Sequence, residues 1–476
     1  MGGASTSPAK GRIESLLDTN SFVEIGADIT ARNTDFNLNA KKAPSDGVIT
    51  GYGLIEGRPV YIYSQDNSVL NGTMGEMHAG KIIRMYKLAL KTGDPVIGLI
   101  DCAGMRLEEG LDGLHAFGKI WRIQSEASGV IPQITAVFGM CGGGMALVPS
   151  LSDFTFIEKA KGRLFLQAPN ALPGNSEETC DTSAPDFRFS QGETDGYGSS
   201  EEIMQKIRDI LSYLPSNNEE EIFSQREGLD LNTVQEDLDQ WVKDPALILQ
   251  QISDTGRVCE IKAGYAPEMY TAFSCIGGYT AGIIANRQAV YGPDGLDSEY
   301  APVLTAADAE KASRFLSFCD AFSIPVISFV NVTGMDAGIK AETDLLKMAS
   351  KLAYTAARAD TVRISVITGK AYGTAALLMN SRSLGADLVY AWKDTKTGLM
   401  DAAAAAKILS DSAETSVVQK TAEQYDSLQN SAGSAAARGY IDTVIDPSET
   451  RKYLIGALDM LFTKRSGMAC KKHEAF

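Results

Sequence analysis

Short apolar runs alternate with amphipathic stretches through the first half of the chain. Two of these runs, residues 47–55 and 58–64, are separated by a short turn that contains a glycine, which predicts a β-hairpin. Residues 81–90 carry apolar side chains at helical spacing, and residues 95–101 form a continuous apolar run typical of a buried strand. This alternation of strands and helices predicts a layered α/β domain.

A glycine-rich segment at residues 139–145 follows the apolar run 133–138 and precedes residues that can continue as a helix. A strand that runs through glycines into a helix leaves backbone N–H groups without acceptors at the positive end of the helix dipole. Such a turn is suited to hold a developing negative charge. A second segment of the same kind, residues 369–376, follows the apolar run 363–368.

The two glycine segments belong to a longer repeat. Their starting points differ by 369 − 139 = 230 residues. An earlier apolar run at residues 95–97 is followed by Gly104, a similar run at residues 325–327 is followed by Gly334, and 334 − 104 is again 230. Because two features repeat in the same order at one offset, the sequence predicts a duplicated domain.

Length and composition agree with a duplication. A chain of 476 residues exceeds one ordinary core and suits two domains of roughly 200 residues or somewhat more. Hydrophobic residues at 44% and charged residues at 22% describe a soluble globular protein. The stretch from residue 217 to residue 243 is acidic and strongly charged, so we place the domain junction there and predict domains at residues 1–226 and 227–476.

Charge and cysteine usage exclude several classes of function. The net charge of −16 argues against a nucleic-acid partner, because phosphate binding needs clustered Lys and Arg. No apolar run is long enough to span a membrane, and the N-terminal segment lacks an apolar signal core. Seven cysteines without a C-x-x-C pair fit a reducing compartment and indicate neither a disulfide framework nor a zinc site. We therefore expect a cytoplasmic protein without direct membrane insertion and without a metal site.

Few candidate catalytic side chains accompany the first turn. Of three histidines, His78 and His115 fall in segments that look helical and are interpreted as packing or surface residues, so a histidine base is not the expected catalyst. Ala103 and Gly104 follow the strand at residues 95–101 and can lie beside the first turn, because consecutive strand ends commonly adjoin. The two segments would then supply two N–H donors to one oxyanion; the alternative is a pair of tight turns that need glycine for positive φ. Arg106 is either a phosphate contact or a solvated loop charge.

Several strings in this chain resemble, in order and over nearly the whole length, the carboxyltransferase (beta) subunit of biotin-dependent acyl-CoA carboxylases and their decarboxylase relatives. The resemblance includes propionyl-CoA carboxylase beta chains and methylmalonyl-CoA decarboxylase alpha subunits. The strings are DGVITG (46–51), YSQD (63–66), SGVIPQI (128–134), GGG (142–144), DFTF (153–156), GYAPE (264–268), FCDAF (318–322) and KAYG (370–373).

This resemblance implies tandem crotonase/ClpP-like domains, with layered sheets and flanking helices. It implies that the N–H groups of Gly143 and Gly144 hold the thioester oxygen of an acyl-CoA, and that those of Thr374 and Ala375 hold the ureido oxygen of biotin. Further binding residues implied around the two turns are Ala103, Gly104 and Arg106 in the first domain and Gly373 and Leu377 in the second.

The resemblance also implies the partners. No A-M-K-M biotin attachment string occurs, so biotin is expected on a separate carrier protein. The other expected partners are a biotin carboxylase subunit or a membrane decarboxylase subunit. In the family the site forms between the first domain of one subunit and the second domain of another, so a homo-oligomer is expected, as a hexamer built from three dimers.

The second domain departs from the family pattern. Thr374 stands where a second glycine is usual, Leu377 occupies the position that tunes acyl-chain choice, and Asp401 replaces a glycine. Two other functions therefore stay open beside carboxyl transfer. One is a biotin-independent crotonase-type enzyme that acts as a thioester hydrolase or isomerase at the first turn. The other is a non-catalytic subunit that binds CoA or scaffolds a carboxylase complex.

Overall fold

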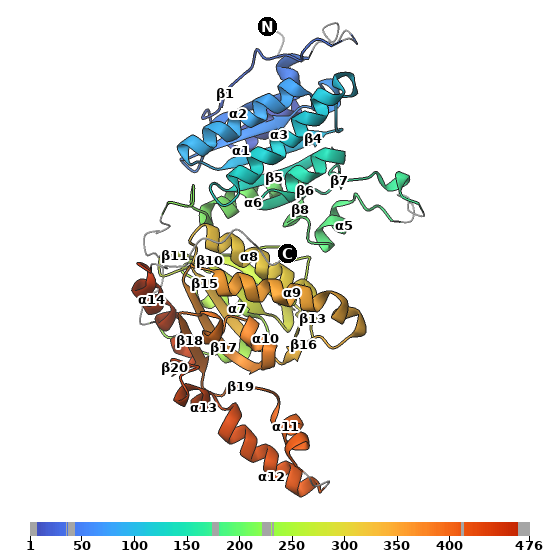
Figure 1. Ribbon diagram of the computed structural model, residues 1–476. Helices are drawn as coiled ribbons and strands as arrows, with labels where there is room; N and C mark the ends of the chain where they lie inside the picture. Colours follow the sequence, from blue (N-terminus) through green and yellow to red (C-terminus); the bar gives the residue numbers. More distant parts are fainter. Residues whose placement is uncertain are drawn as a thin grey trace. The chain divides into compact units, whose positions relative to one another are not determined.

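The computed structural model describes residues 7–34, 36, 43–173, 180–220, 230, 233–410 and 414–464. The chain divides into two compact units, Met1–Glu220 and Glu221–Phe476. The predicted domain boundary between residues 226 and 227 lies outside the described residues. Each unit by itself is an α/β fold with a central sheet and flanking helices (Figure 1).

The first unit is built on an eight-stranded sheet. The predicted hairpin is present as the antiparallel pair β2–β3, and the sheet continues from β3 with parallel strands. In order across the sheet the strands are β1 (Val23–Glu24), β2 (Val48–Ile55), β3 (Arg58–Gln65), β4 (Val96–Cys102), β5 (Gln133–Gly142), β6 (Phe154–Glu158) and β8 (Gly196–Gly198), and β7 (Arg163–Phe165) pairs with β5.

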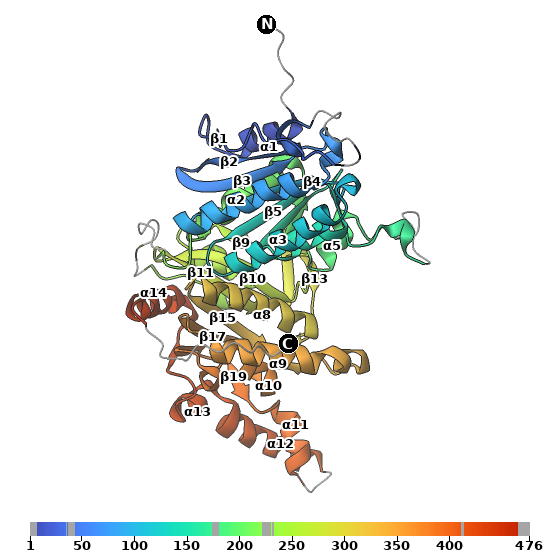
Figure 2. The ribbon, with the colours of Figure 1, turned by 45° about the horizontal axis from the view of Figure 1, so that its top comes forward.

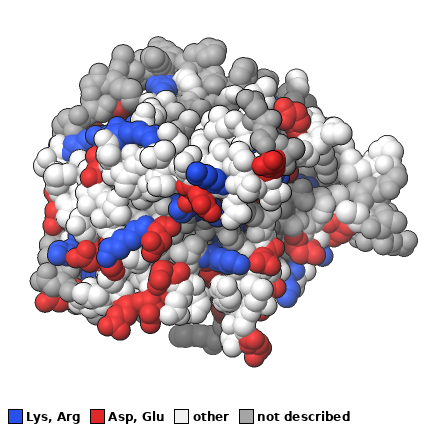
Figure 3. Space-filling view, turned by 90° about the horizontal axis from the view of Figure 1, so that it is seen from below, with Lys and Arg blue, Asp and Glu red and all other residues white. Residues whose placement is uncertain are grey.

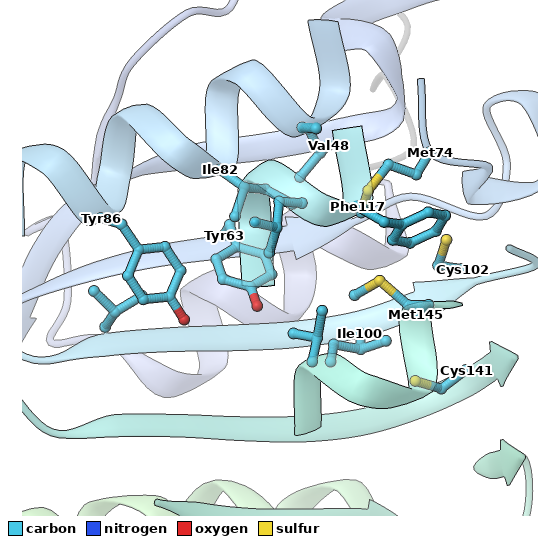
Figure 4. Packing of buried hydrophobic residues seen from close by; sticks show 14 of the residues in the cluster. Val48, Tyr63, Met74, Ile82, Tyr86, Ile100, Cys102, Phe117, Cys141 and Met145 are labelled. Carbon is cyan, nitrogen blue, oxygen red and sulfur yellow. The ribbon is translucent and has the colours of Figure 1, made fainter. Parts of the chain in front are cut away.

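Helices α2 (Glu76–Thr92) and α3 (Leu111–Ala127) pack side by side against this sheet, and Figures 1 and 2 show both in front of it. Figure 4 shows the core between them and the strands, where Tyr63, Tyr86 and Phe117 pack with Met145. Burying such aromatic and aliphatic side chains is the main stabilising contribution to a unit of this size. Helices α1 (Pro8–Leu16) and α6 (Ser200–Tyr213) contact each other and the strands.

The second unit repeats this plan on its own eight-stranded sheet. Helices α8 (Ala306–Ala321) and α9 (Ile339–Arg358) pack together as α2 and α3 do, and α7 (Pro245–Ile252) and α14 (Thr450–Leu461) complete the unit. The strands in order are β9 (Val258–Glu260), β10 (Met269–Ile276), β11 (Tyr279–Asn286), β15 (Val326–Val332), β17 (Arg363–Tyr372), β18 (Leu388–Trp392) and β20 (Thr443–Ile445), and β19 (Lys396–Gly398) pairs with β17.

The strand register shows that the duplication extends to single residues. Val96 pairs with Gln133, the register breaks between Ile100 and Cys102, and Cys102 then pairs with Cys141. In the second unit Val326 pairs with Arg363, the break falls between Val330 and Val332, and Val332 pairs with Ala371. Each of these positions lies 230 residues after its counterpart, for example 332 − 102 and 371 − 141. The predicted repeat is therefore confirmed in the fold.

Both turns begin later than the sequence predicts. Strand β5 continues through Gly139 to Gly142, and β17 continues through Gly369 to Tyr372. The reason is non-local: Met140 pairs with Arg163 of β7, and Lys370 pairs with Lys396 of β19, so each short strand extends the long one. The N–H groups available at each turn are consequently those that follow Gly142 and Tyr372.

The units differ where segments are added. In the first unit, residues 174–179 lie outside the described chain, and residues 180–199 contain α5 (Pro185–Ser190) and β8. In the second unit an alanine-rich stretch forms α11 (Ala402–Leu409), which Asp401 caps by accepting a hydrogen bond from the N–H of Ala403 at 2.9 Å. The second unit also adds α12 (Thr415–Tyr425), α13 (Ala432–Ala437), β12 (Ala289–Gly292) and β13 (Gly295–Glu299). By contrast, β14 (Val303–Leu304) and β16 (Gly334–Met335) correspond to the bridge between Met74 and Met105 in the first unit.

Two features of the surface and helices bear on partners. None of the helices within the described ranges is long and apolar enough to cross a membrane. On the face shown in Figure 3, Lys and Arg side chains are interspersed with Asp and Glu, and the side chains described there form no continuous basic area.

Candidate active site

The first turn joins β5 to a short helical segment, η5 (Gly143–Ala146), which leads into α4 (Leu147–Ser150). Gly143 has φ +61°, a left-handed conformation that glycine adopts without strain. The first N–H groups of a helix have no acceptor inside it. Outside the regular helix and strand pattern, no described residue accepts a hydrogen bond from the N–H of Gly143 or Gly144. The turn thus offers two backbone donors to an anionic oxygen.

The space behind the turn is filled by aromatic rings. A Cβ atom on Gly144 would lie 3.3 Å from Phe117 and 3.4 Å from Trp121, whereas a Cβ on Gly143 would meet no heavy atom within 4 Å. Phe117 and Trp121 stack with ring centroids 6.1 Å apart. The rings fix the backbone of Gly144 from one side, and the open space lies at Gly143.

The loop after β4 lies beside this turn, as the sequence predicts. Gly104 has φ +111°, and a Cβ there would lie 3.7 Å from the carbonyl oxygen of Gly142. Ala103 is exposed next to it. Cys102 is buried and its Sγ lies 3.4 Å from the N–H of Gly104; burial raises the pKa of the thiol to about 11, so it stays protonated at neutral pH. Cys102 therefore contributes packing and not a nucleophile.

Arg106 is not presented to a phosphate, nor is it a solvated loop charge. Its side chain is 1% exposed. Nη1 lies 2.6 Å from Asp46 Oδ1 and 2.8 Å from Glu109 Oε1, and Nη2 donates to the carbonyl of Thr73 at 2.7 Å. The sequence prediction missed this role because Asp46 is sixty positions away along the chain. Arg106 holds the loop after β4 in place from the inside.

Replacing Arg106 with lysine is expected to lower the free energy of unfolding by about 1.5–3 kcal/mol, because an ammonium group cannot reproduce the forked contacts with two buried carboxylates. Urea titration measures the change. Arg122→Lys is the matched control, since the Arg122 side chain is 82% exposed and its ion pair within the described residues is with Glu126 of the same helix. Unchanged stability together with weaker acyl-CoA binding would restore Arg106 as a ligand contact.

The two candidate histidines are a packing residue and a surface residue. His78 is fully buried, its Nδ1 lies 2.9 Å from the carbonyl of Asp46, and its Nε2 lies 3.1 Å from the side-chain amide of Gln65. Burial lowers its pKa to about 3, so the ring stays neutral. His115 is exposed on α3. Both positions agree with the absence of a histidine base from the predicted chemistry.

The second turn has the same construction. Strand β17 ends at Tyr372, Gly373 has φ +62°, and α10 runs from Gly373 to Leu378. The N–H groups of Thr374 and Ala375 lie in the first turn of α10 and have no intrahelical acceptor. Thr374 is exposed, in contrast to Gly144, which backs onto aromatic rings. The threonine is accommodated because its side chain leaves the turn without changing the backbone donor.

Thr374→Ala is therefore expected to keep turnover within about twofold of the wild type, since surface substitutions away from special contacts change free energies by roughly 0.5 kcal/mol or less. Steady-state rates with both substrates measure this. A loss of tenfold or more would mean that the hydroxyl itself contacts a ligand.

An equivalent polar residue lies at the register break behind each turn, Asp101 in the first unit and Asn331 in the second. The sequence prediction missed both. Asn331 Oδ1 accepts from the N–H of Lys370 at 3.0 Å. The equivalent residue in the first unit, 331 − 230, is Asp101, which pairs with Arg12 at 2.7 Å and with Asn67 at 3.1 Å. The sequence could have shown that these two residues are equivalent, because they are separated by the same 230 positions as the glycines of the turns.

A cavity of about 530 Å³ opens beside the second turn, within the range typical of small-molecule sites. Gly373 and Leu377 both line it, and Leu377 is 48% exposed. Buried side chains of the sheet, Val330, Ile367 and Val389, form its apolar part. Leu377 thus lies next to a cavity and not in the core.

The two units define a class: a tandem α/β fold of the crotonase type, with a glycine turn that follows the long central strand in each unit. Comparison with known proteins identifies the family. The family model described as the carboxyl transferase domain matches residues 7–476, so the chain belongs to this family.

Two relatives of this chain are, by name, subunits of an acyl-CoA decarboxylase and an acyl-CoA carboxylase. It is 36% identical over 482 residues to the methylmalonyl-CoA decarboxylase subunit alpha of Veillonella parvula, covering 98% of this chain and 92% of that one. It is 34% identical over 498 residues to the propionyl-CoA carboxylase beta chain of Saccharopolyspora erythraea, covering 98% and 89%.

A solved structure matches at a TM-score of 0.91 and 34% identity, covering 98% of this chain and 91% of the other. It is the transcarboxylase 12S hexamer with hydrolysed methylmalonyl-coenzyme A bound. The predicted family, the tandem crotonase-like fold and the class of activity, carboxyl transfer on acyl-CoA, are confirmed by these comparisons.

Proposed function

We propose that this chain is the carboxyltransferase subunit that moves a carboxyl group between carboxybiotin, carried on a separate protein, and the α carbon of an acyl-CoA. The observation that carries the proposal is the pair of equivalent turns at Gly143 and Gly373, with φ of +61° and +62°. Carboxyl transfer develops negative charge on two oxygens, one on the thioester and one on the ureido group. A duplicated turn provides one donor set for each.

The residues of the turns fit these groups. Gly143 and Gly144 donate to the thioester oxygen, and Thr374 and Ala375 donate to the ureido oxygen. No carboxylate occurs in residues 142–147 or 372–378, so nothing within either turn repels a developing anion. Loss of one such donor typically costs about 2.7–4 kcal/mol of transition-state stabilisation, or 10²–10³ in rate.

Biotin on its carrier would supply the carboxyl group and a ureido nitrogen able to take the substrate proton. The chain then needs no base of its own, which agrees with the neutral, fully hydrogen-bonded His78. Ala103 and Gly104 shape the loop beside the first turn, and Gly373 and Leu377 shape the cavity beside the second.

The assembly proposed for this chain follows its relatives. We infer a homo-hexamer made of three dimers, served by a biotin carboxyl carrier protein and by either a biotin carboxylase or a membrane decarboxylase subunit. The transcarboxylase 12S relative is a hexamer, and the decarboxylase and carboxylase relatives are named as subunits or chains. The cysteine pattern supports a cytoplasmic location.

Carboxyl exchange tests the proposal. Purified protein incubated with methylmalonyl-CoA or malonyl-CoA and free biocytin should transfer the carboxyl group to biocytin. Thioester hydrolysis without exchange would support the biotin-independent crotonase-type enzyme instead. Binding of CoA with neither reaction would support a scaffold subunit.

A further inference from the structure

A bulge interrupts the strand pairing just before each turn. Asp101 of β4 is the single residue opposite residues 138–140 of β5, and Asn331 of β15 is the single residue opposite residues 368–370 of β17. At a bulge the regular ladder of hydrogen bonds is disrupted, so other contacts must fix the extra residues of the long strand. Because each turn follows its bulge directly along the chain, the conformation of the bulge affects the turn.

A side-chain amide from the neighbouring strand fixes the bulge residue in both units. Gln65, the last residue of β3, accepts a hydrogen bond at Oε1 from the N–H of Asp101 at 3.2 Å. Asn286, the last residue of β11, accepts one at Oδ1 from the N–H of Asn331 at 3.1 Å. Gln65 is 0% exposed and Asn286 is 7% exposed. Since β3 and β11 each lie parallel to the bulged strand, the contact belongs to the repeated plan of the fold.

The side chain of the bulge residue lies against the long strand. Asn331 Oδ1 accepts a hydrogen bond from the N–H of Lys370 at 3.0 Å. A Cβ atom on Gly369 would overlap the side-chain amide of Asn331, and a Cβ atom on Gly139 would overlap the carboxylate of Asp101. Each long strand therefore needs glycine at this position. The contacts run from the amide residue through the bulge residue to the strand that ends at the turn.

The two amide residues differ in their further contacts. Gln65 Nε2 lies 3.1 Å from His78 Nε2 and 3.9 Å from the sulfur of Met145, which belongs to η5 at the first turn. The link from Asn286 to the second turn runs through Asn331. Variants of Asn286 therefore test the bulge itself, and variants of Gln65 provide the counterpart in the first unit.

We propose that Gln65 and Asn286 are positioning residues, which direct the backbone donors of the first and the second turn by fixing the bulge before each. Neither side chain has to touch a substrate. Misplacing a reacting group by about 1 Å can cost roughly 10² in rate, so a buried hydrogen bond behind the turn can influence turnover. The inference rests on the proposed function, because it concerns the donors that this function uses.

Steady-state kinetics of carboxyl transfer to biocytin test the role of Asn286 in the full-length protein. Asn286→Leu, which has a similar size and no acceptor, should lower kcat by about 10–10²-fold and change the KM for acyl-CoA by no more than about twofold. Asn286→Asp keeps an oxygen acceptor at the same place and should restore most of the rate. If Asn286→Leu does not assemble, Asn286→Ala removes the acceptor without adding bulk.

Thr271→Val is the matched control. Thr271 is fully buried in β10, and its hydroxyl donates to the carbonyl of Ile261 at 2.9 Å. The variant therefore loses one buried hydrogen bond in the strand beside β11 without altering the bulge, and it should keep the wild-type rate.

Hydrogen–deuterium exchange followed by mass spectrometry localises the effect. Asn286→Leu should speed up amide exchange about tenfold or more in residues 368–374 and leave residues 138–144 unchanged, and Gln65→Leu should do the reverse. A wild-type rate in Asn286→Leu, no recovery in Asn286→Asp, an equal loss in Thr271→Val, or equal acceleration in both segments would overturn the proposal. Absence of carboxyl transfer in the wild type would reject the proposed function instead, and the deuterium measurements, which need no substrate, would still decide whether each amide residue fixes its turn.

Discussion

Gly143→Val should lower carboxyl transfer by about 10²–10³-fold while leaving the first unit folded. A β-branched residue is strongly disfavoured at φ +61°, so the backbone must leave this conformation and carry the N–H groups of the turn with it. A Cβ atom at this position meets no heavy atom within 4 Å, so the expected cost comes mainly from the backbone conformation. Single-turnover rates, together with circular dichroism and the oligomeric state, measure the outcome.

The matched control for this prediction is Gly57→Val. Gly57 has φ +77° and open space around its Cβ position, and it lies in the β2–β3 hairpin away from the turn. It should therefore lose stability to a similar degree and keep its rate. If Gly57→Val lost activity equally, backbone strain alone would explain both results. If Gly143→Val broke the oligomer, the turn would be structural and not catalytic.

Gly373→Val should lower the rate of carboxyl exchange with biocytin by about 10²–10³-fold and leave acyl-CoA binding at the first turn intact. Gly373 has φ +62°, and a Cβ there would lie 3.2 Å from the carbonyl oxygen of Leu399, so valine both strains the backbone and crowds the neighbouring loop. Titration with acyl-CoA and the exchange assay separate the two effects.

Gly256→Val controls for this change within the second unit. Gly256 has φ +69° and a carbonyl oxygen, that of Gln250, 3.4 Å from its Cβ position, which closely matches the surroundings of Gly373. Its variant should retain exchange. A Gly373→Val protein that still carboxylates biocytin at the wild-type rate would remove the second turn from the proposed mechanism and favour a function confined to the first turn.

The sequence predicts the repeat and the existence of both turns because glycine and apolar spacing are local signals. It places each turn several residues too early, because the extra length of β5 and β17 depends on pairing with β7 and β19. The role of Arg106 is hidden for the same reason: burial beside Asp46 is a tertiary property that a loop sequence does not reveal.

The departures from the family pattern have structural explanations of different kinds. Thr374 is compatible with its turn because the side chain is exposed, and Asp401 caps α11. The cavity beside Leu377 was not predicted, since it is enclosed by segments from residue 330 to residue 441 that only the fold brings together. Local motifs predicted the two turns, whereas the space around them depends on the tertiary structure.

Building both turns from peptide amides has a consequence for how acidity acts on this protein. An amide N–H neither gains nor loses a proton over the physiological range, and the nearby Cys102 thiol, with its pKa raised to about 11, is equally silent there. A bend in a plot of rate against pH between 6 and 9 would then come from other groups, such as Asp308 and Lys81, whose pKa values burial shifts to about 7 and about 8, or from the reacting molecules, and not from the amides of the two turns.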